Sequence, residues 1–238
     1  MTGKKDDRMV NLRWFLALGS LVGVVGCSGG PGSIAPVGLA PTDAAVVEGW
    51  IGRFQPHAAR LYRIRPWRYR NERGSAAGRA VVRVAPPDSM RFDYQGPFRK
   101  SGKAAVVGDS ALWVVPDDDF GGLVALAPVF WAAVGLPQAP PPGTPVFAMT
   151  RGEVRAWRYI VAGDTLNFVL RGNPATRLLA EIRRRGRTIG VADVRLDPVT
   201  GFAVKAKIDL PIEPSRFEFT VEHVDTLATF DPTIWLPN

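Results

Sequence analysis

Alternation of apolar and polar residues is the dominant pattern from Arg79 to the end of the chain. In 201–210, for example, every second residue is apolar and most residues between them are charged. A period of two residues is typical of a strand with one buried and one solvated face. The pattern predicts about ten short strands, at 79–85, 89–95, 103–109, 111–115, 154–161, 165–170, 176–184, 187–196, 201–210 and 215–224.

Turn residues separate these runs. Gly163–Asp164 predicts a two-residue hairpin turn, and Gly108–Asp109 predicts a second hairpin. Asp197–Gly201 supplies a longer turn between two strands. Strands joined in this way are consecutive and antiparallel, and their alternation predicts a sheet with one apolar and one solvated face.

Two segments have the pattern of helices. Apolar residues recur at helical spacing in 43–54, with Thr42 as the expected N-cap. Residues 118–137 are nearly all apolar, and Pro128 would kink or break a helix there. We therefore expect one helix before the strands and one apolar helical segment in the middle of them.

The predicted fold class is mainly β (α+β), with a curved antiparallel sheet whose concave face is covered by the two helices. A long sheet with one covered side curls, and two short helices cannot fill a wide curved sheet. What remains is a concave apolar space, either packed with side chains or open to a ligand. A closed barrel or a two-layer sandwich would show similar alternation.

The start of the chain has the order of a secretory signal. Four basic residues precede an apolar run from Trp14 to Gly26, which ends at Cys27. The run is shorter than the roughly 20 apolar residues of a transmembrane helix. Val24–Cys27 resembles the bacterial lipobox, in which the cysteine thiol takes a diacylglycerol and becomes the first residue after cleavage. A short buried helix with an inert cysteine and a plain N-terminal anchor are the alternatives.

The sequence is therefore expected to divide into three parts. Residues 1–26 are a lipoprotein signal peptide, 27–41 are a flexible tether rich in Gly, Pro and Ser, and 42–238 are one folded domain. Ser28 follows the modified cysteine. Because Asp at that position commonly signals retention at the inner membrane, we expect the outer membrane, facing the periplasm, with the surface of the cell membrane as the alternative.

Charge is spread along the chain with one local cluster. The whole chain carries +8, and the signal contributes four basic and two acidic residues, which leaves the mature chain at about +6. The cluster consists of Arg183, Arg184, Arg185 and Arg187. It could dock anionic headgroups or a protein partner, or could simply keep an exposed hairpin soluble. Nucleic acid is excluded as an expected partner, because an exported, anchored protein does not meet it and no nucleic-acid motif occurs.

The sequence contains no recognisable catalytic or metal-binding motif. His57 and His223 lie far apart and lack the spacing of a metal site. Asp117–Asp119 could bind a cation, although such a run is more often a solvated loop with a helix cap. Neither a GxSxG elbow nor a phosphate-binding loop is found. We therefore expect a non-enzymatic protein with no metal and no cofactor.

Residues 87–116 resemble the LolA/LolB-like superfamily of periplasmic lipoprotein carriers and outer-membrane lipoprotein receptors. After an N-terminal helix, a strand ends in Pro-Asp and is followed by MRFDYQGP and then VVGDSALWVVP. The resemblance implies an incomplete β-barrel closed by helices over a hydrophobic cavity that holds acyl chains. It also implies that Arg91, Phe92, Trp113 and the segment around Phe130–Trp131 line or lid this cavity. The lipidation of the chain itself departs from the carrier's pattern, and the long proline-rich loop and the unusual central apolar helix depart from the receptor's pattern.

The aromatic residues on the predicted strands are either ordinary core or part of a cavity lining. The candidates for a lining are Trp67, Phe92, Trp113, Phe130, Trp131, Phe147, Trp157 and Phe168. Arg91 joins the arginine cluster as a candidate contact for headgroups or a partner.

Two functions are consistent with these features. The first is a membrane-anchored lipoprotein, a carrier or receptor, that binds lipid or lipoprotein acyl chains in a hydrophobic cavity. The alternative is a structural or adaptor envelope lipoprotein with a filled core, which recruits an envelope protein through the basic cluster or the proline-rich loop.

Overall fold

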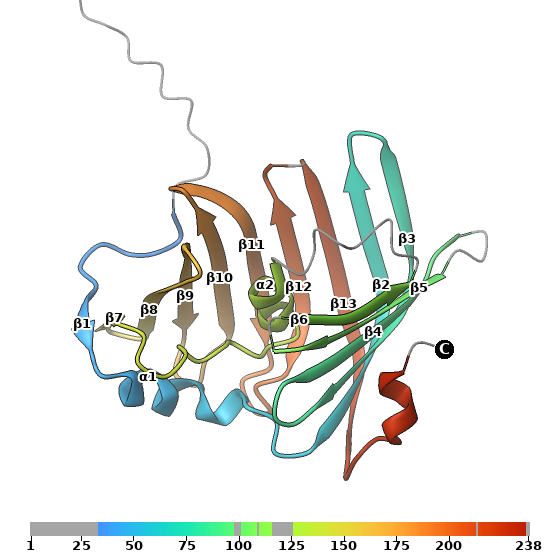
Figure 1. Cartoon of the computed structure of the whole chain (residues 1–238), viewed down its shortest axis with the longest axis horizontal. Helices are drawn as coiled ribbons and strands as arrows, with labels where there is room; N and C mark the ends of the chain where they lie inside the picture. Colours follow the sequence, from blue (N-terminus) through green and yellow to red (C-terminus); the bar gives the residue numbers. More distant parts are fainter. Residues whose placement is uncertain (1–32, 98–100, 109, 116–125, 213, 237–238) are drawn as a thin grey trace, which may run out of the picture. The chain divides into compact units, whose positions relative to one another are not determined.

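One open antiparallel sheet makes up most of the described part of the chain (Figure 1). The computed structural model describes residues 33–97, 101–108, 110–115, 126–212 and 214–236. Thirteen strands lie in the order β1-β7-β8-β9-β10-β11-β12-β13-β2-β3-β4-β5-β6, and each neighbouring pair is antiparallel. β1 and β6 are the two edges, so the sheet is not closed. The expected curved antiparallel sheet is confirmed, and the closed barrel and the sandwich are excluded for the described part of the chain.

The strands have the following bounds: β1 (Ala40–Thr42), β2 (Ala59–Asn71), β3 (Gly74–Ala85), β4 (Ser89–Gln95), β5 (Ser101–Val107), β6 (Ser110–Val115), β7 (Val146–Arg151), β8 (Val154–Val161), β9 (Asp164–Arg171), β10 (Arg177–Arg184), β11 (Arg187–Leu196), β12 (Ala203–Leu210) and β13 (Ser215–Leu227). The ten predicted runs all lie within this sheet, which also contains β1, β2 and β7. Ala162–Gly163, both at positive φ, form the two-residue turn between β8 and β9, one residue before the expected Gly163–Asp164, because Asp164 already pairs with Val161.

The helices are shorter than the sequence predicted. α1 (Ala44–Ile51) continues into the 3₁₀ turn η1 (Gly52–Phe54). Its N-cap is Asp43, which accepts a hydrogen bond from the backbone N–H of Ala45 at 2.9 Å, so the expected cap at Thr42 was wrong: Thr42 ends β1.

In the middle of the chain, α2 spans Ala127–Ala133. Pro128 lies in the first turn of α2, where a missing N–H costs little. It therefore does not kink or break this helix, contrary to the prediction. The part of the predicted helix before Leu126, including the aspartates that could cap it, lies outside the described residues.

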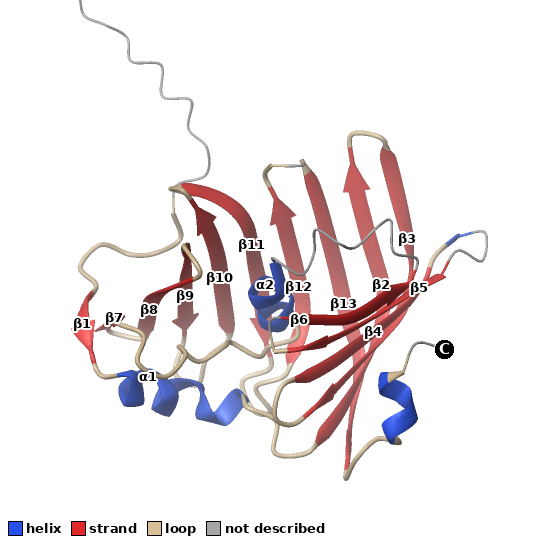
Figure 2. Ribbon diagram, viewed as in Figure 1, coloured by secondary structure: helices blue, strands red, loops and turns tan. Residues whose placement is uncertain are grey.

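Small residues in the middle of the sheet make room for α2. α2 contacts β10, β11 and β12, where Ala180 and Ala192 lie side by side and fully buried. On β11, a Cβ at Gly190 would be only 3.2 Å from Leu126 and 3.5 Å from Val129. The inner-face row through these alanines reads Ala148, Trp157, Phe168, Ala180, Ala192, Ile208 and Phe217. The helix therefore packs against the β10–β12 part of the sheet, where Figure 2 shows it.

The sheet bends around α2. Trp131 of α2 donates a hydrogen bond from Nε1 to the carbonyl oxygen of Gly108, 2.9 Å away, at the turn between β5 and β6. β5 and β6 lie at one edge of the sheet, far in strand order from the β10–β12 floor. One short helix can touch both only if the sheet is strongly curved, and Figure 1 shows β4, β5 and β6 passing on the side where α2 lies.

The segment before α1 is part of the folded body. Ile34 and Leu39 pack against Ala156, Val169 and Leu179, which form a small apolar cluster separate from the main core. β1 then pairs with β7. The expected flexible tether, 27–41, is therefore wrong for residues 33–41, because their apolar side chains cover the outer face of β8–β10.

We expect Gly190→Leu to lower the free energy of unfolding by about 1–3 kcal/mol, because the added side chain must displace Leu126 and Val129 of the α2 region. The change is measured as a lower midpoint of urea unfolding. Gly49→Ala in α1 is the control: nothing lies within 4 Å of the new Cβ, and alanine favours the helix by about 0.5–1 kcal/mol. An unchanged midpoint for Gly190→Leu would show that α2 does not rest on this part of β11.

Candidate functional site

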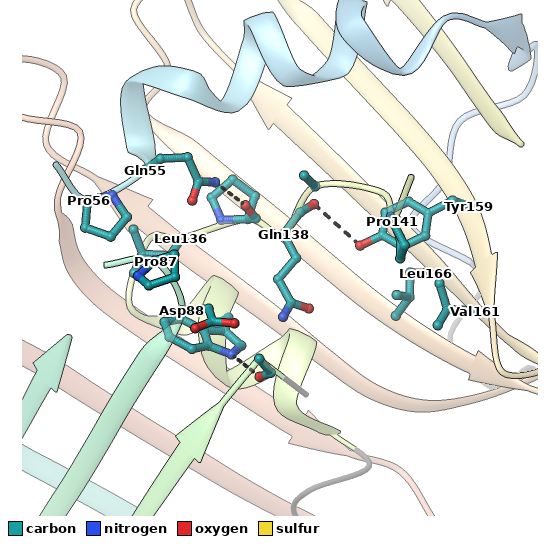
Figure 3. A pocket seen from close by; sticks show the side chains of 14 residues that line it. Gln55, Pro56, Pro87, Asp88, Leu136, Gln138, Pro141, Tyr159, Val161 and Leu166 are labelled. Atoms are coloured by element: carbon teal, nitrogen blue, oxygen red, sulfur yellow. Dashed lines mark hydrogen bonds between the residues drawn. The ribbon is translucent and has the colours of Figure 1, made fainter. Parts of the chain in front are cut away.

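A cleft of about 230 Å³ opens beside α2 (Figure 3). Its walls come from five places: the end of η1, the β3–β4 and β5–β6 turns, α2 with the segment that follows it, and β8–β9. The lining residues are Gln55, Pro56, Pro87, Asp88, Gly108, Trp131, Leu136, Pro137, Gln138, Ala139, Pro141, Tyr159, Val161 and Leu166. Small-molecule pockets commonly measure about 300–1,000 Å³, so this cleft is too small to enclose a large apolar ligand.

Hydrogen bonds across the cleft hold its walls together. Gln55 donates from Nε2 to the carbonyl oxygen of Pro137 at 3.1 Å. The hydroxyl of Tyr159 makes a longer bond, 3.5 Å, to the carbonyl oxygen of Gln138. With the Trp131–Gly108 bond, these contacts join η1, β8 and the β5–β6 turn to the region of α2. The cleft can hold a small group, and its enlargement would break bonds that link separate elements.

The first aromatic group of the inner face is closely packed. Trp157 and Phe168 are stacked, with ring centroids 5.0 Å apart and ring planes at 10°. Tyr159 stacks on Phe168 at 5.9 Å, and Trp50 of α1 lies 6.2 Å from Trp157. All except Trp50 are fully buried. Apart from the 230 Å³ cleft, which Tyr159 borders, this half of the concave face is filled by the protein's own side chains.

The second aromatic group, on the other side of α2, is only partly covered. We call it the aromatic cluster: Trp67 on β2, Phe92 and Tyr94 on β4, and Phe217 and Phe219 on β13. Neighbouring rings lie 5.8–6.3 Å apart, centroid to centroid. The deepest members, Trp67 and Phe219, are buried, whereas Phe92, Tyr94 and Phe217 keep intermediate exposure. A continuous apolar surface therefore reaches solvent from the core.

Arg91 and Trp113 lie on the opposite, outer face of the sheet. They share a row with Arg83 and Ala105, so their side chains point away from Phe92. The guanidinium of Arg91 lies 5.2 Å from the centroid of the Trp113 ring. The expectation that Arg91 and Trp113 line or lid an inner cavity was wrong, because the register of β4–β6 turns both outward.

The C-terminal segment covers this outer-face pair. Arg91 donates to the carbonyl oxygen of Ile234, and Trp113 donates from Nε1 to that of Trp235 at 2.7 Å. Both acceptors belong to the 3₁₀ turn η5 (Pro232–Trp235). Asp231 caps this turn, and its bonds from the N–H and hydroxyl of Thr233 lower the pKa of the Asp231 carboxyl. Arg91 is thus a structural contact for η5.

The remaining candidates are divided between the two faces. Trp67, Trp131, Trp157 and Phe168 are buried on the inner side, and Phe92 and Phe130 are partly exposed there. Phe147 is 37% exposed and alternates with buried Val146 and Ala148, so it faces outward and was wrongly included. Cys27 and Asp117–Asp119 lie outside the described residues. Tyr94, Phe217 and Phe219 were missed, although the alternation in 215–224 places the two phenylalanines on one face.

The histidines and carboxylates of the described chain do not form a metal centre. Among these residues, no group of three His, Cys, Asp or Glu side chains could hold a metal ion. His57 is exposed, and His223 is also exposed, 2.8 Å from the Asp225 carboxylate on the same strand. The described helices include none with the length and apolar character needed to cross a membrane.

Solved structures share this architecture. The LolA superfamily protein from Nitrosomonas europaea superposes with a TM-score of 0.56 over 82% of this chain and 98% of that chain, at 9% sequence identity. A Vibrio parahaemolyticus domain assigned to outer membrane lipoprotein sorting gives a TM-score of 0.52 over 81% of this chain and 95% of its own, at 8% identity. No protein-family model and no curated protein matches the sequence. The chain has a LolA-like fold, as the resemblance of residues 87–116 implied.

We expect Asp93→Asn to lower the free energy of unfolding by about 2–3 kcal/mol. The carboxylate of Asp93 pairs with Arg83 and with Arg91, whose side chain is 8% exposed, and its loss leaves two neighbouring arginines without a counter-charge. Chemical denaturation measures the effect. Asp225→Asn is the control, because its pair with Arg63 is exposed and should contribute less than about 1 kcal/mol. Equal losses in the two variants would contradict a structural role for the Arg91–Asp93 pair.

Proposed function

We propose that this protein is a membrane-anchored lipoprotein of the bacterial envelope that binds an acyl chain, from a lipid or another lipoprotein, on the aromatic cluster. The observation that carries the proposal is the partial exposure of Phe92, Tyr94 and Phe217 on the inner face, next to α2. In this role the protein is a carrier or receptor and performs no chemistry. Cys27 supplies its own anchor through an attached diacylglycerol.

Apolar burial accounts for the affinity. Covering apolar surface is worth about 25 cal/mol per Å², and an acyl chain laid along the aromatic cluster would cover its rings without breaking a hydrogen bond. Rings also offer broad, rigid contact surfaces. The ligand would lie across the partly exposed rings of Phe92, Tyr94 and Phe217, with one side in contact with solvent.

The neighbours in fold support the envelope setting. One is a LolA superfamily protein, and another is assigned to outer membrane lipoprotein sorting. The lipobox-like Val24–Cys27, followed by Ser28, fits the outer membrane, with the domain facing the periplasm. The surface of the cell membrane is the alternative location.

A second candidate function has its own supporting observation. Val129, Trp131 and Ala132 of α2 are buried against the sheet, and the cleft beside them measures about 230 Å³. A filled concave face suits an adaptor that recruits an envelope protein partner through its surface. In that case the aromatic cluster would be an apolar rim of the core and would take no acyl chain.

Photo-crosslinking in living cells separates the two functions. Cells that express the full-length protein are fed a palmitate analogue bearing an alkyne and a diazirine. We expect ultraviolet-dependent label on the peptides that contain Phe92–Tyr94 and Phe217–Phe219. Phe217→Ala should reduce this label several-fold, because it removes apolar contact area. Phe147→Ala, on the outer face, is the control and should leave the label unchanged.

Either of two results would favour the adaptor instead: no ultraviolet-dependent label on these peptides, or label that Phe217→Ala leaves intact. Circular dichroism of the purified variants shows whether Phe217→Ala retains its β structure. If it does not, Phe217→Leu, which keeps an apolar side chain of similar reach, replaces it in the same comparison.

The same probe tests the anchor without ultraviolet light. We expect label on the peptide that begins at Cys27 in the wild-type protein and its complete loss in Cys27→Ala, because only the thiol accepts the diacylglycerol. Gel fluorescence after attachment of a dye to the alkyne measures the label. A wild-type protein that stays unlabelled while a known lipoprotein in the same cells is labelled would refute membrane anchorage through Cys27.

A further inference from the structure

The described chain begins beside one particular hairpin. Ser33 donates a hydrogen bond from Oγ to Oε2 of Glu181 on β10, 2.7 Å away. Glu181 is almost fully buried and also accepts from Asn167 at 2.9 Å and from Thr188 at 2.6 Å. Because these partners come from β9, β10 and β11, Ser33 has a defined place on the outer face of the sheet.

The tip of the β10–β11 hairpin lies immediately beyond this point. Glu181 is two residues before Arg183, and the turn follows at Arg185–Gly186, both at positive φ. Figure 1 shows the first described residues entering the fold next to the end of β10. The chain that leads back from Ser33 toward Cys27 therefore leaves the domain near the strand ends at which this hairpin projects.

The hairpin tip carries unneutralised positive charge. Arg183 lies 3.5 Å from Glu181, and Arg184 forms a bidentate pair with Asp164 at 2.7–2.9 Å. Arg185 and Arg187 are exposed and have no ion pair with any described residue. Four arginines face two carboxylates, so the tip keeps an excess of positive charge that no other described residue pairs with.

The spacing to Cys27 puts this charge near the bilayer. Ser33 lies six positions after Cys27, with five residues between them, and six steps of fully extended chain span at most roughly 20 Å. A domain anchored through Cys27, as in the proposed function on which this step rests, cannot move far from the membrane surface. Because anionic headgroups attract basic side chains within a Debye length of about 8 Å, the side of the domain from which the anchor leaves is the side that meets them.

We propose that Arg185 and Arg187, at the tip of the β10–β11 hairpin, bind anionic lipid headgroups of the membrane that holds the Cys27 anchor. The contact is a second attachment point beside the first, and two points restrict how the domain can rotate. The end of the strands at which this hairpin projects then faces the bilayer. The opposite ends of β9–β11, at Arg171 and Arg195, point away from the membrane.

Arginine footprinting on the mature lipoprotein tests the contact. The protein is purified from membranes, its acyl chains are verified by intact mass, and it is reconstituted in vesicles of phosphatidylcholine with or without phosphatidylglycerol. Phenylglyoxal modification of each arginine is followed by mass spectrometry. We expect phosphatidylglycerol to slow the modification of Arg185 and Arg187 at least about fivefold, the effect of the usual attraction of one arginine to an anionic surface. High salt should remove the protection.

Arg171 and Arg195 are controls within the same molecule, since both are exposed at the other end of their strands. Their rates should be equal in the two kinds of vesicle. Equal rates at Arg185 and Arg187 in a lipidated protein would overturn the headgroup contact while leaving the proposed function intact. Protection in native envelope membranes but not in phosphatidylglycerol vesicles would overturn it in favour of a protein partner. A mature protein without acyl chains would contradict the anchor and this inference together.

Discussion

The contact between α2 and the floor of β10–β12 determines what the concave face can hold. Ala180, Ala192 and Gly190 remove side-chain volume where the helix rests, and Val129, Trp131 and Ala132 fill that space from the helix side. Close packing of this kind leaves few voids and resists displacement. The bond from Trp131 to Gly108 then ties the bent edge of the sheet to the same helix. The curvature of the sheet and the division of its inner-face aromatic side chains into a buried and a partly exposed group both follow from this packed contact.

The position of α2 between the two aromatic groups explains how one LolA-like fold can have a filled half and an accessible half. Trp157 and Phe168 lie on the α1 side of α2, where stacking and burial leave only the small cleft beside Tyr159. Phe92 and Phe217 lie on the other side, where their rings remain partly exposed. The two outer-face covers, η5 over Arg91 and the 33–39 segment over β8–β10, shield other apolar surface. The aromatic cluster keeps its exposure even though both terminal segments are folded onto the sheet.

Much of the architecture could be predicted from local pattern. Alternation identified the strands with long, regular apolar rows, such as β12. The turn at Asp197 also lies where it was expected, and the Asp197 carboxylate accepts hydrogen bonds from the N–H groups of Val199 and Thr200. β2 was not predicted as a strand, because Pro66 and a register shift between Ile64 and Trp67 interrupt its period of two. The N-terminal segment was read as a tether because Gly, Pro and Ser dominate it. Two apolar residues, Ile34 and Leu39, suffice to hold it against the sheet.

The candidate site was harder to predict, because the register between strands decides toward which face of the sheet each side chain points. Aromatic content alone could not separate Trp113 on β6 from Phe92 on β4, which lie on opposite faces of the sheet. The most direct test of the account follows the indole N–H signals of the mature protein by NMR while lysophospholipid is added below its micelle concentration. We predict that the Trp67 signal shifts with saturation, while those of Trp157, packed under α1, and Trp113, on the outer face, stay in place. Movement of the Trp157 signal with Trp67 unchanged would show that the ligand enters the half assigned here as filled, and would contradict the account.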